Sequence, residues 1–284
     1  MKIRTKPLVM GGLLVSALGL TSMVYAADAE PAAPAVDAAA AVAAPVSPHT
    51  LSSNIGFFTD YTFRGISYTR ERGAIQGGFD YSNANGLYAG IWGSNVDKNA
   101  LYGNTMETDL YGGYVYQINP DVGINVGFLQ FLYPNHDKAG ATSSTPGTGG
   151  SANTTELNAS VTYKWLTLKQ SVAVSNFFGL NNGYDGHGDS SGSGYTELNF
   201  NYQLPVQAIN LALHVGHQTV RGRSIADYTD YLVGINKDFE IAGSKGWNAG
   251  VNFTTTDANS TWYVDSTGFK TGDSRAIGFI KRTF

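Results

Sequence analysis

From residue 51 onward, apolar and polar side chains alternate with a period of two, and this pattern limits the fold more than any other feature. In the segment 156–165, polar residues occupy the even positions and apolar residues the odd positions. The segments 195–203, 209–218 and 246–255 repeat the pattern. Because successive side chains of a β-strand point to opposite faces, such alternation predicts strands with one apolar and one polar face. The sequence therefore predicts an all-β fold.

The alternating segments predict about twelve strands, most of them near ten residues long. About ten residues is the length that a tilted β-strand needs to cross a membrane. The predicted strands are 53–63, 73–81, 86–95, 106–117, 122–132, 154–164, 166–176, 195–203, 209–218, 228–236, 246–255 and 274–284.

The connections between these strands alternate between long and short, with 237–245 as the weak case. Transmembrane barrels have this arrangement, because short periplasmic turns alternate with longer external loops. A secreted β-sandwich is the alternative, but its loops need not alternate in length. Only 14% of the residues are charged, against about 25% in soluble domains. Aromatic residues such as Tyr61, Phe63, Tyr133 and Trp247 are expected in girdles at the strand ends. We predict an antiparallel transmembrane β-barrel over 51–284.

The first 26 residues have the order of a secretory signal peptide. Lys2, Arg4 and Lys6 precede an apolar stretch at 8–20, and small residues lead up to Ala26. Thirteen apolar residues are too few to span a bilayer, which takes roughly 20. We predict cleavage after Ala26, followed by an Ala/Pro-rich periplasmic spacer at 27–50. This order predicts export to the outer membrane of a Gram-negative cell.

Several classes of function are excluded or disfavoured by the composition. The chain has no cysteine, and its 18 Lys and Arg are outnumbered by 22 Asp and Glu, so thiolate chemistry and nucleic-acid binding are not expected. No nucleophile motif accompanies the histidines, so we predict no enzyme. The loop 181–189 has oxygen ligands but lacks the spaced carboxylates of a calcium loop, and no metal or cofactor is predicted. The five histidines are His49, His136, His187, His214 and His217.

Residues 54–114 resemble a known family. The run Thr59-Asp60-Tyr61-Thr62-Phe63-Arg64-Gly65-Ile66-Ser67 is similar to the S/T-D-Y-x-F-R-G-x-S signature of the TorF family of porin-like proteins. The segments 74–81, 86–96, 107–114 and 273–284 continue the resemblance. The resemblance implies an outer-membrane barrel with a channel role, and it implies neither a substrate nor a mechanism.

Charged residues on the polar faces are candidates for the lining or rim of a lumen. A charge facing lipid costs roughly 2–4 kcal/mol at the midplane, so these groups are expected to face inward whether or not anything passes. The acids outnumber the bases, which predicts a weak preference for cations. The candidates are Asp60, Arg64, Asp80, Glu107, Asp109, Glu156, Lys164, Lys169, Glu197, Asp230, Arg275 and Lys281.

Arg64 has two possible roles at the end of the first predicted strand. With Asp60 and Glu107 it could form an anion-binding or constriction pair. It could instead form a structural salt bridge at the rim, where Gly65 lets the chain bend into the first loop. The structural role is favoured.

Together these features predict a porin for passive diffusion of small hydrophilic solutes or ions. The alternatives are a non-conducting structural or adhesive barrel and, less favoured, a barrel enzyme. The expected partners are outer-membrane lipid, the solutes or ions, and the barrel-assembly machinery, which reads a terminal aromatic such as Phe284. Arg282 weakens that terminal signal, because it occupies a position on the same face where an apolar residue is expected.

Overall fold

A computed structural model describes residues 48–101, 103–134, 151–180, 187–205, 207–265 and 267–284. The predicted signal peptide, most of the predicted spacer, His136 and most of the loop 181–189 lie outside these residues. Within the described part of the chain, no helix has the length and apolar character needed to cross a membrane.

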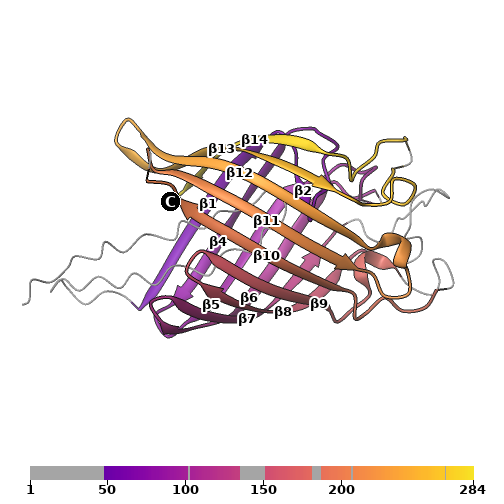
Figure 1. Ribbon diagram of the computed structural model, residues 1–284, viewed down its shortest axis with the longest axis horizontal. Helices are drawn as coiled ribbons and strands as arrows, with labels where there is room; N and C mark the ends of the chain where they lie inside the picture. The colour runs from indigo at the N-terminus through magenta and orange to yellow at the C-terminus, as the bar shows by residue number, and fades with distance from the viewer. Residues whose placement is uncertain (1–47, 102, 135–150, 181–186, 206, 266) are drawn as a thin grey trace, which may run out of the picture.

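Twelve antiparallel strands close into one barrel, which confirms the predicted fold and strand number (Figure 1). Each strand pairs with its neighbours in the chain, and β1 pairs with β14 to close the cylinder. The wall strands are β1 (His49–Phe58), β4 (Ala74–Asn83), β5 (Leu87–Asn95), β6 (Met106–Asn119), β7 (Val122–Leu132), β8 (Thr154–Tyr163), β9 (Leu166–Ala173), β10 (Gly194–Gln203), β11 (Ile209–Thr219), β12 (Tyr228–Ile241), β13 (Ser244–Thr256) and β14 (Arg275–Thr283).

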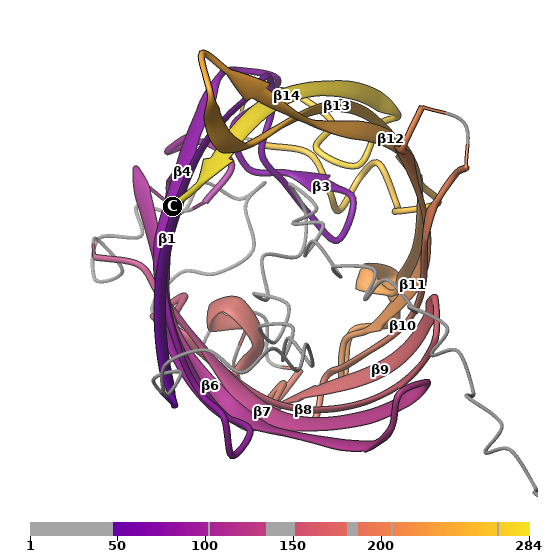
Figure 2. The ribbon, with the colours of Figure 1, turned by 90° about the vertical axis from the view of Figure 1, so that its left-hand side faces the viewer.

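The two strands outside the wall, β2 (Thr62–Phe63) and β3 (Ile66–Ser67), form a small hairpin of their own. Viewed along the barrel, β3 and the short helix η1 (Phe177–Gly179) appear inside the ring of strands (Figure 2). A second short helix, η2 (Ser224–Ala226), lies between β11 and β12.

The alternation of long and short connections is complete in the structure. Short turns follow β4, β6, β8, β10 and β12, and every other connection between wall strands is longer. The predicted weak case at 237–245 was wrong, because β12 and β13 both extend through it. They meet in a two-residue turn at Ala242-Gly243, where both residues have positive φ, as tight hairpin turns require. We call the two ends of the barrel the short-turn end and the long-loop end.

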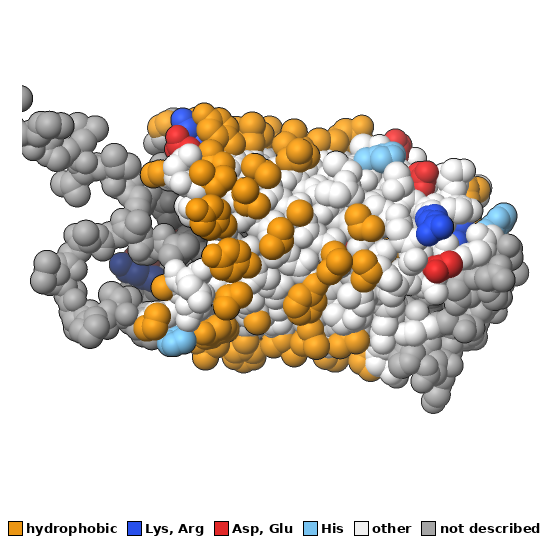
Figure 3. Space-filling model, turned by 90° about the horizontal axis from the view of Figure 1, so that it is seen from below, with side chains coloured by type: hydrophobic (Ala, Val, Ile, Leu, Met, Phe, Trp, Pro, Cys, Tyr) orange, Lys and Arg blue, Asp and Glu red, His pale blue; other side chains and the backbone are white. Residues whose placement is uncertain are grey.

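The outer surface of the wall is apolar. Val126, Leu168 and Val233 face outward and are each half exposed, at 50%, 54% and 52%. In the face that Figure 3 shows, apolar side chains spread over the wall, while the charged side chains gather toward the two ends. These apolar side chains are not buried in a core. The outer surface of the wall therefore needs an apolar medium around it.

Large aromatic rings lie against the inner wall over glycines of neighbouring strands. The Tyr111 ring covers Gly90, and the Tyr195 ring covers Gly216, so that a Cβ at either glycine would overlap the ring. The register supports both pairs, because β5 runs beside β6 and β10 beside β11. These glycines let bulky inward residues fit inside a barrel of only twelve strands.

The first predicted strand, 53–63, was wrong at both ends. β1 begins at His49, two residues before the predicted start of the barrel, and ends at Phe58. The chain then leaves the wall and folds into the interior, where Tyr61 and Phe63 are 1% and 5% exposed. Tyr133 is also buried. These three aromatics therefore do not belong to a lipid-facing girdle, whereas Trp247 is partly exposed near the short-turn end.

Candidate permeation path

The residues between β1 and β4 form the feature that dominates the interior, and we call 59–73 the inner hairpin. Its two strands are joined at Arg64 and Gly65, which have φ values of 49° and 75°. Positive φ at both central residues gives the tight turn that matches the twist of a hairpin. A side chain at Gly65 would also meet Asp230, whose Cβ would lie 2.9 Å from the added Cβ. Arg64 and Gly65 therefore determine both the turn and its close contact with Asp230 on the wall.

Asp60 holds the base of the inner hairpin. Its Oδ1 accepts hydrogen bonds from Ser67 Oγ at 2.8 Å, from Thr69 Oγ1 at 2.6 Å and from the Glu71 N–H at 3.1 Å. Its Oδ2 lies 3.3 Å from Arg275 Nε on β14. Burial raises the pKa of Asp60, and the hydrogen bonds and Arg275 only partly offset that rise. This carboxylate therefore organises the hairpin backbone.

Arg64 at the tip reaches the opposite wall of the barrel. Its two Nη atoms donate to both oxygens of Glu156 on β8, at 3.1 and 2.7 Å, and Nη1 also donates to Gln218 on β11 at 2.8 Å. The guanidinium stacks on Tyr195 of β10 at 4.1 Å. β8, β10 and β11 stand across the barrel from β1 in the strand order. Two-point pairing of this kind is among the strongest polar contacts in proteins.

The predicted partners of Arg64 were wrong. Glu156 takes the place of Asp60 and Glu107, because the hairpin carries Arg64 away from the rim and into the interior. Glu107 instead accepts hydrogen bonds from the hydroxyls of Tyr61 at 2.6 Å and Tyr133 at 2.5 Å.

Aromatic rings fill the long-loop half of the interior around this hairpin. Phe63 lies 5.3 Å from Phe131 and 5.6 Å from Phe178, measured between ring centroids. The inner hairpin is therefore packed on several sides.

Asp109, on the same inner face as Glu107, is 2% exposed, and its Oδ1 has no hydrogen-bond partner among the described residues.

A second group of charges lies on β9 to β12. Lys169 Nζ is 3.3 Å from Glu197, and His214 Nε2 is 2.9 Å from Asp230. The Tyr195 hydroxyl donates to Asp230 at 2.9 Å. Lys169 thus pairs with an acid on this wall, which offsets part of the excess of acid that the sequence predicts for the lumen.

All the candidate charges except Lys164 lie on the inner wall or the inner hairpin. Lys164 lies at the rim, because it occupies the two-residue turn after β8, where it is exposed and 3.7 Å from Asp121. Asp80 accepts a hydrogen bond from the Tyr111 hydroxyl at 2.5 Å. Lys281 lies on the inward face of β14, the same face as Arg275.

Sequence reasoning missed two partners of Arg64, namely Tyr195 and Gln218. Gln218 shares the inward face of β11 with His214. The alternation places Gln218 in the interior, but it carries no information about which residue on another strand would contact it.

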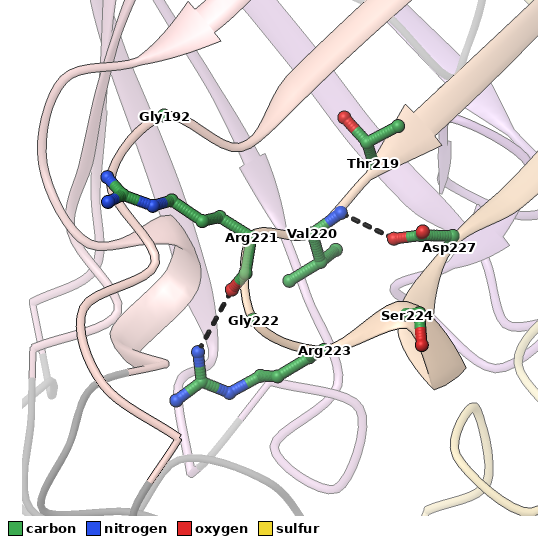
Figure 4. Close-up of a pocket in the computed structure, with 8 residues that line it drawn as sticks. All are labelled: Gly192, Thr219, Val220, Arg221, Gly222, Arg223, Ser224 and Asp227. Atoms are coloured by element: carbon green, nitrogen blue, oxygen red, sulfur yellow. Dashed lines mark hydrogen bonds between the residues drawn. The ribbon is translucent and has the colours of Figure 1, made fainter.

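Inward residues near the long loops, such as Glu107 and Glu156, are buried. Toward the short turns the inward residues are mixed, because Asn125 and Asn199 are partly exposed whereas Asn210 is buried. A separate shallow pocket of about 420 Å³ lies at the long-loop end, where Asp227 accepts the Val220 N–H at 2.6 Å (Figure 4). It is formed largely by the β11–β12 loop and is not part of the charged path.

No group of three or more acidic or histidine side chains suited to a metal ion occurs among the described residues.

The fold and the interior define a closed barrel with an apolar exterior and a charged, partly blocked lumen. Residues 42–284 match the Gcw_chp family, described as bacterial proteins of unknown function. Because the match covers most of the chain, the protein belongs to this family. The resemblance to the TorF family stays a prediction. No curated protein matches the chain.

Among solved structures, the chain is similar to outer-membrane porins. A KdgM porin shares 11% identity over 82% of this chain and 99% of its own, with a TM-score of 0.49. KdgM in complex with disordered oligogalacturonate gives 9% identity over the same shares of the two chains and the same TM-score. OprD from Pseudomonas aeruginosa shares 13% identity over 82% of this chain and 65% of its own, with a TM-score of 0.37.

Proposed function

We propose that the protein is a non-enzymatic outer-membrane channel through which small hydrophilic solutes or ions diffuse passively. The observation that carries the proposal is the sidedness of the closed barrel, in which apolar residues such as Val233 face outward and paired charges such as Arg64 and Glu156 face inward. Only helices and closed barrels satisfy their backbone groups inside a bilayer. The predicted signal peptide at 1–26 and spacer at 27–50 accord with an outer-membrane location.

The constriction of this channel is the inner hairpin with its Arg64–Glu156 pair. Twelve strands enclose less space than the 16 to 18 strands of general porins, and the hairpin occupies part of it. Charges fixed on opposite sides of a narrow lumen order water and select among permeants. The channel therefore passes small solutes slowly.

The second candidate is a barrel that conducts nothing and serves as a scaffold. The buried contacts of Arg64 with β8, β10 and β11 favour it, because they join opposite walls. The two candidates make different predictions for a variant that loses these contacts.

Planar-bilayer recording of the refolded protein tests the proposal. The wild type is expected to give small conductance steps with weak ion selectivity, and Arg64→Ala is expected to give larger ones. The exposed turn variant Lys164→Ala is the matched control and should behave like the wild type. If neither the wild type nor Arg64→Ala conducts, the scaffold is correct.

We extend the proposal to the assembly machinery, which would recognise the C-terminal residue. The Phe284 side chain is 62% exposed beyond the end of β14, and the Arg282 guanidinium stacks on its ring at 4.3 Å. Removal of Phe284 should lower the amount of folded barrel in the outer membrane, which heat-modifiable gel migration measures. Unchanged assembly would count against this partner.

A further inference from the structure

The short-turn half of the inner wall is rich in asparagine side chains from many strands. All of them face inward by the alternation of their strands, and they are buried or partly exposed. Five lie in the half of their strand next to a short turn, and Asn158 lies near the middle of β8. The six are Asn125, Asn158, Asn199, Asn210, Asn236 and Asn248.

Three of these amides are hydrogen-bonded to one another across β11, β12 and β13. Asn236 Oδ1 accepts hydrogen bonds from Asn210 at 3.1 Å and from Asn248 at 2.8 Å. Asn199 Oδ1 lies 2.7 Å from His214 Nδ1. The side chains are therefore held in fixed positions along β10 to β13, as a preorganised polar surface requires.

Two buried amide oxygens of this wall lack a partner among the described residues. Asn158 is 7% exposed, and its Oδ1 accepts no hydrogen bond. Asn248 on β13 is also 7% exposed, and its Oδ1 accepts no hydrogen bond. An unsatisfied buried polar group costs about 1–3 kcal/mol. A ligand that donates hydrogen bonds to these oxygens would remove part of that cost.

The inward charges in this half of the lumen include Asp80, Lys169, Asp238 and Lys281; Lys169 is paired with Glu197 at 3.3 Å, and Lys281 lies opposite Asn248 in the strand register. Asp80 is bound by the Tyr111 hydroxyl at 2.5 Å, and Asp238 is bound by Asn248 at 2.7 Å. The amides are nevertheless the most numerous polar groups of the surface, and an amide can offer two donors and an acceptor. The hydroxyl groups of a sugar or sugar alcohol are the complement of such groups, because each can donate and accept.

We infer that this asparagine surface, the six asparagines named above, binds neutral polyhydroxylated solutes below the inner hairpin. The inference names the substrate class of the proposed channel and rests on that function. Solutes that enter from the short-turn end would bind to this surface before they reach the constriction.

Raffinose, a neutral trisaccharide, is the probe, and polyethylene glycol of equal hydrodynamic size is the control. Polyethylene glycol chains accept hydrogen bonds through ether oxygens but have few donors, so they report exclusion by size alone. In planar bilayers, raffinose is expected to reduce the ion current saturably, and polyethylene glycol without saturation. Calorimetry with the barrel refolded in a sugar-free detergent measures raffinose binding without any need for conductance.

The triple variant Asn125→Ala, Asn158→Ala and Asn199→Ala is expected to weaken raffinose binding by about fivefold for each hydrogen bond lost. Asn99→Ala, in the β5–β6 loop, is the control and should bind as the wild type does. Heat-modifiable migration checks that each variant folds, and the single Asn158→Ala variant replaces the triple one if it does not.

Two outcomes overturn the inference. Raffinose and polyethylene glycol would affect the current alike, or raffinose would bind the folded asparagine variants as tightly as the wild type. A wild-type barrel that gives no current contradicts the proposed channel instead, and calorimetry then still decides whether the surface binds raffinose.

Discussion

The Arg64 guanidinium and the Glu156 carboxylate form two parallel hydrogen bonds inside the barrel, although 92 residues separate them in the chain. Both side chains are 3% exposed. The pair joins the hairpin after the first strand to a strand on the far wall, so its loss affects both the stability of the barrel and the width of its lumen.

Arg64→Ala is expected to lower the free energy of unfolding by about 3–5 kcal/mol, because it leaves the Glu156 charge buried without its partner. The double variant Arg64→Ala, Glu156→Gln should recover part of that loss. Urea unfolding followed by tryptophan fluorescence measures both. Lys164→Ala breaks an exposed pair worth about 0–1 kcal/mol and is the control. Equal stability of Arg64→Ala and Lys164→Ala would contradict the expectation.

Val233→Arg places a charge on the apolar outer wall of β12. If the wall faces lipid, the variant should be destabilised by about 2–4 kcal/mol in vesicles. Ile225→Arg is the matched control, because Ile225 is also exposed, at 47%, but lies on η2 in a long loop. Unfolding of the refolded barrel in lipid vesicles gives the comparison, and equal effects of the two substitutions would exclude a lipid-facing wall at Val233.

The long loops are expected on the cell exterior and the short turns in the periplasm. The chain has no cysteine, so single cysteines report position without interference. Cysteines at Ser151 and Ser191 should react with an impermeant maleimide on intact cells, whereas a cysteine at Ala84 should react only after lysis. The reverse labelling would mean that the barrel has the opposite orientation.

Acid should weaken the contact between the inner hairpin and the β13–β14 loop. Burial raises the pKa of Asp265, but hydrogen bonds from Thr267 and the Phe269 N–H, together with the Arg70 charge 2.6 Å away, lower it below its ordinary 3.8 overall. A lowered pKa stabilises the fold above the unfolded value, and the contribution is lost as pH falls through the folded value.

The stability difference between the wild type and Asp265→Asn should therefore be constant above about pH 5 and shrink as the pH falls below 3.8. Urea unfolding at a series of pH values measures it. If the stability difference between the wild type and Asp265→Asn grew on acidification, the expected direction of the pH dependence would be wrong.

The wall of the barrel could be predicted from the sequence because one property, the period of two, determines both the strands and the faces of their residues. The inner hairpin could not. Tyr61, Thr62, Phe63 and Arg64 alternate equally well in a wall strand and in a hairpin, since the period reports extended backbone and not which strand lies beside it. Lys164 shows the same limit, because the alternation in the sequence continues through 156–165 although β8 ends at Tyr163 and Lys164 belongs to the turn.

The pairing of Arg64 with Glu156 was also beyond the sequence. It depends on how far the hairpin projects and on which strands stand opposite once the cylinder closes. The inward position of Glu156 was predictable, but its partner was not.

The grip of Arg275 on the inner hairpin has a consequence for the order of assembly. Arg275 belongs to the last strand of the chain, and it contacts Asp60 and the carbonyl oxygen of Gly65, which follow the first strand. The register of β1 with β14 covers Asn54–Phe58, and Ser53 and Thr59 add backbone hydrogen bonds to Phe284 and Gly278, whereas β1 and β4 pair over His49–Phe58. The short closing seam therefore shares its last strand with the anchor of the hairpin. The inner hairpin is fixed and the barrel closes in the same step. Before β14 is added, the chain has neither a closed barrel nor a fixed constriction.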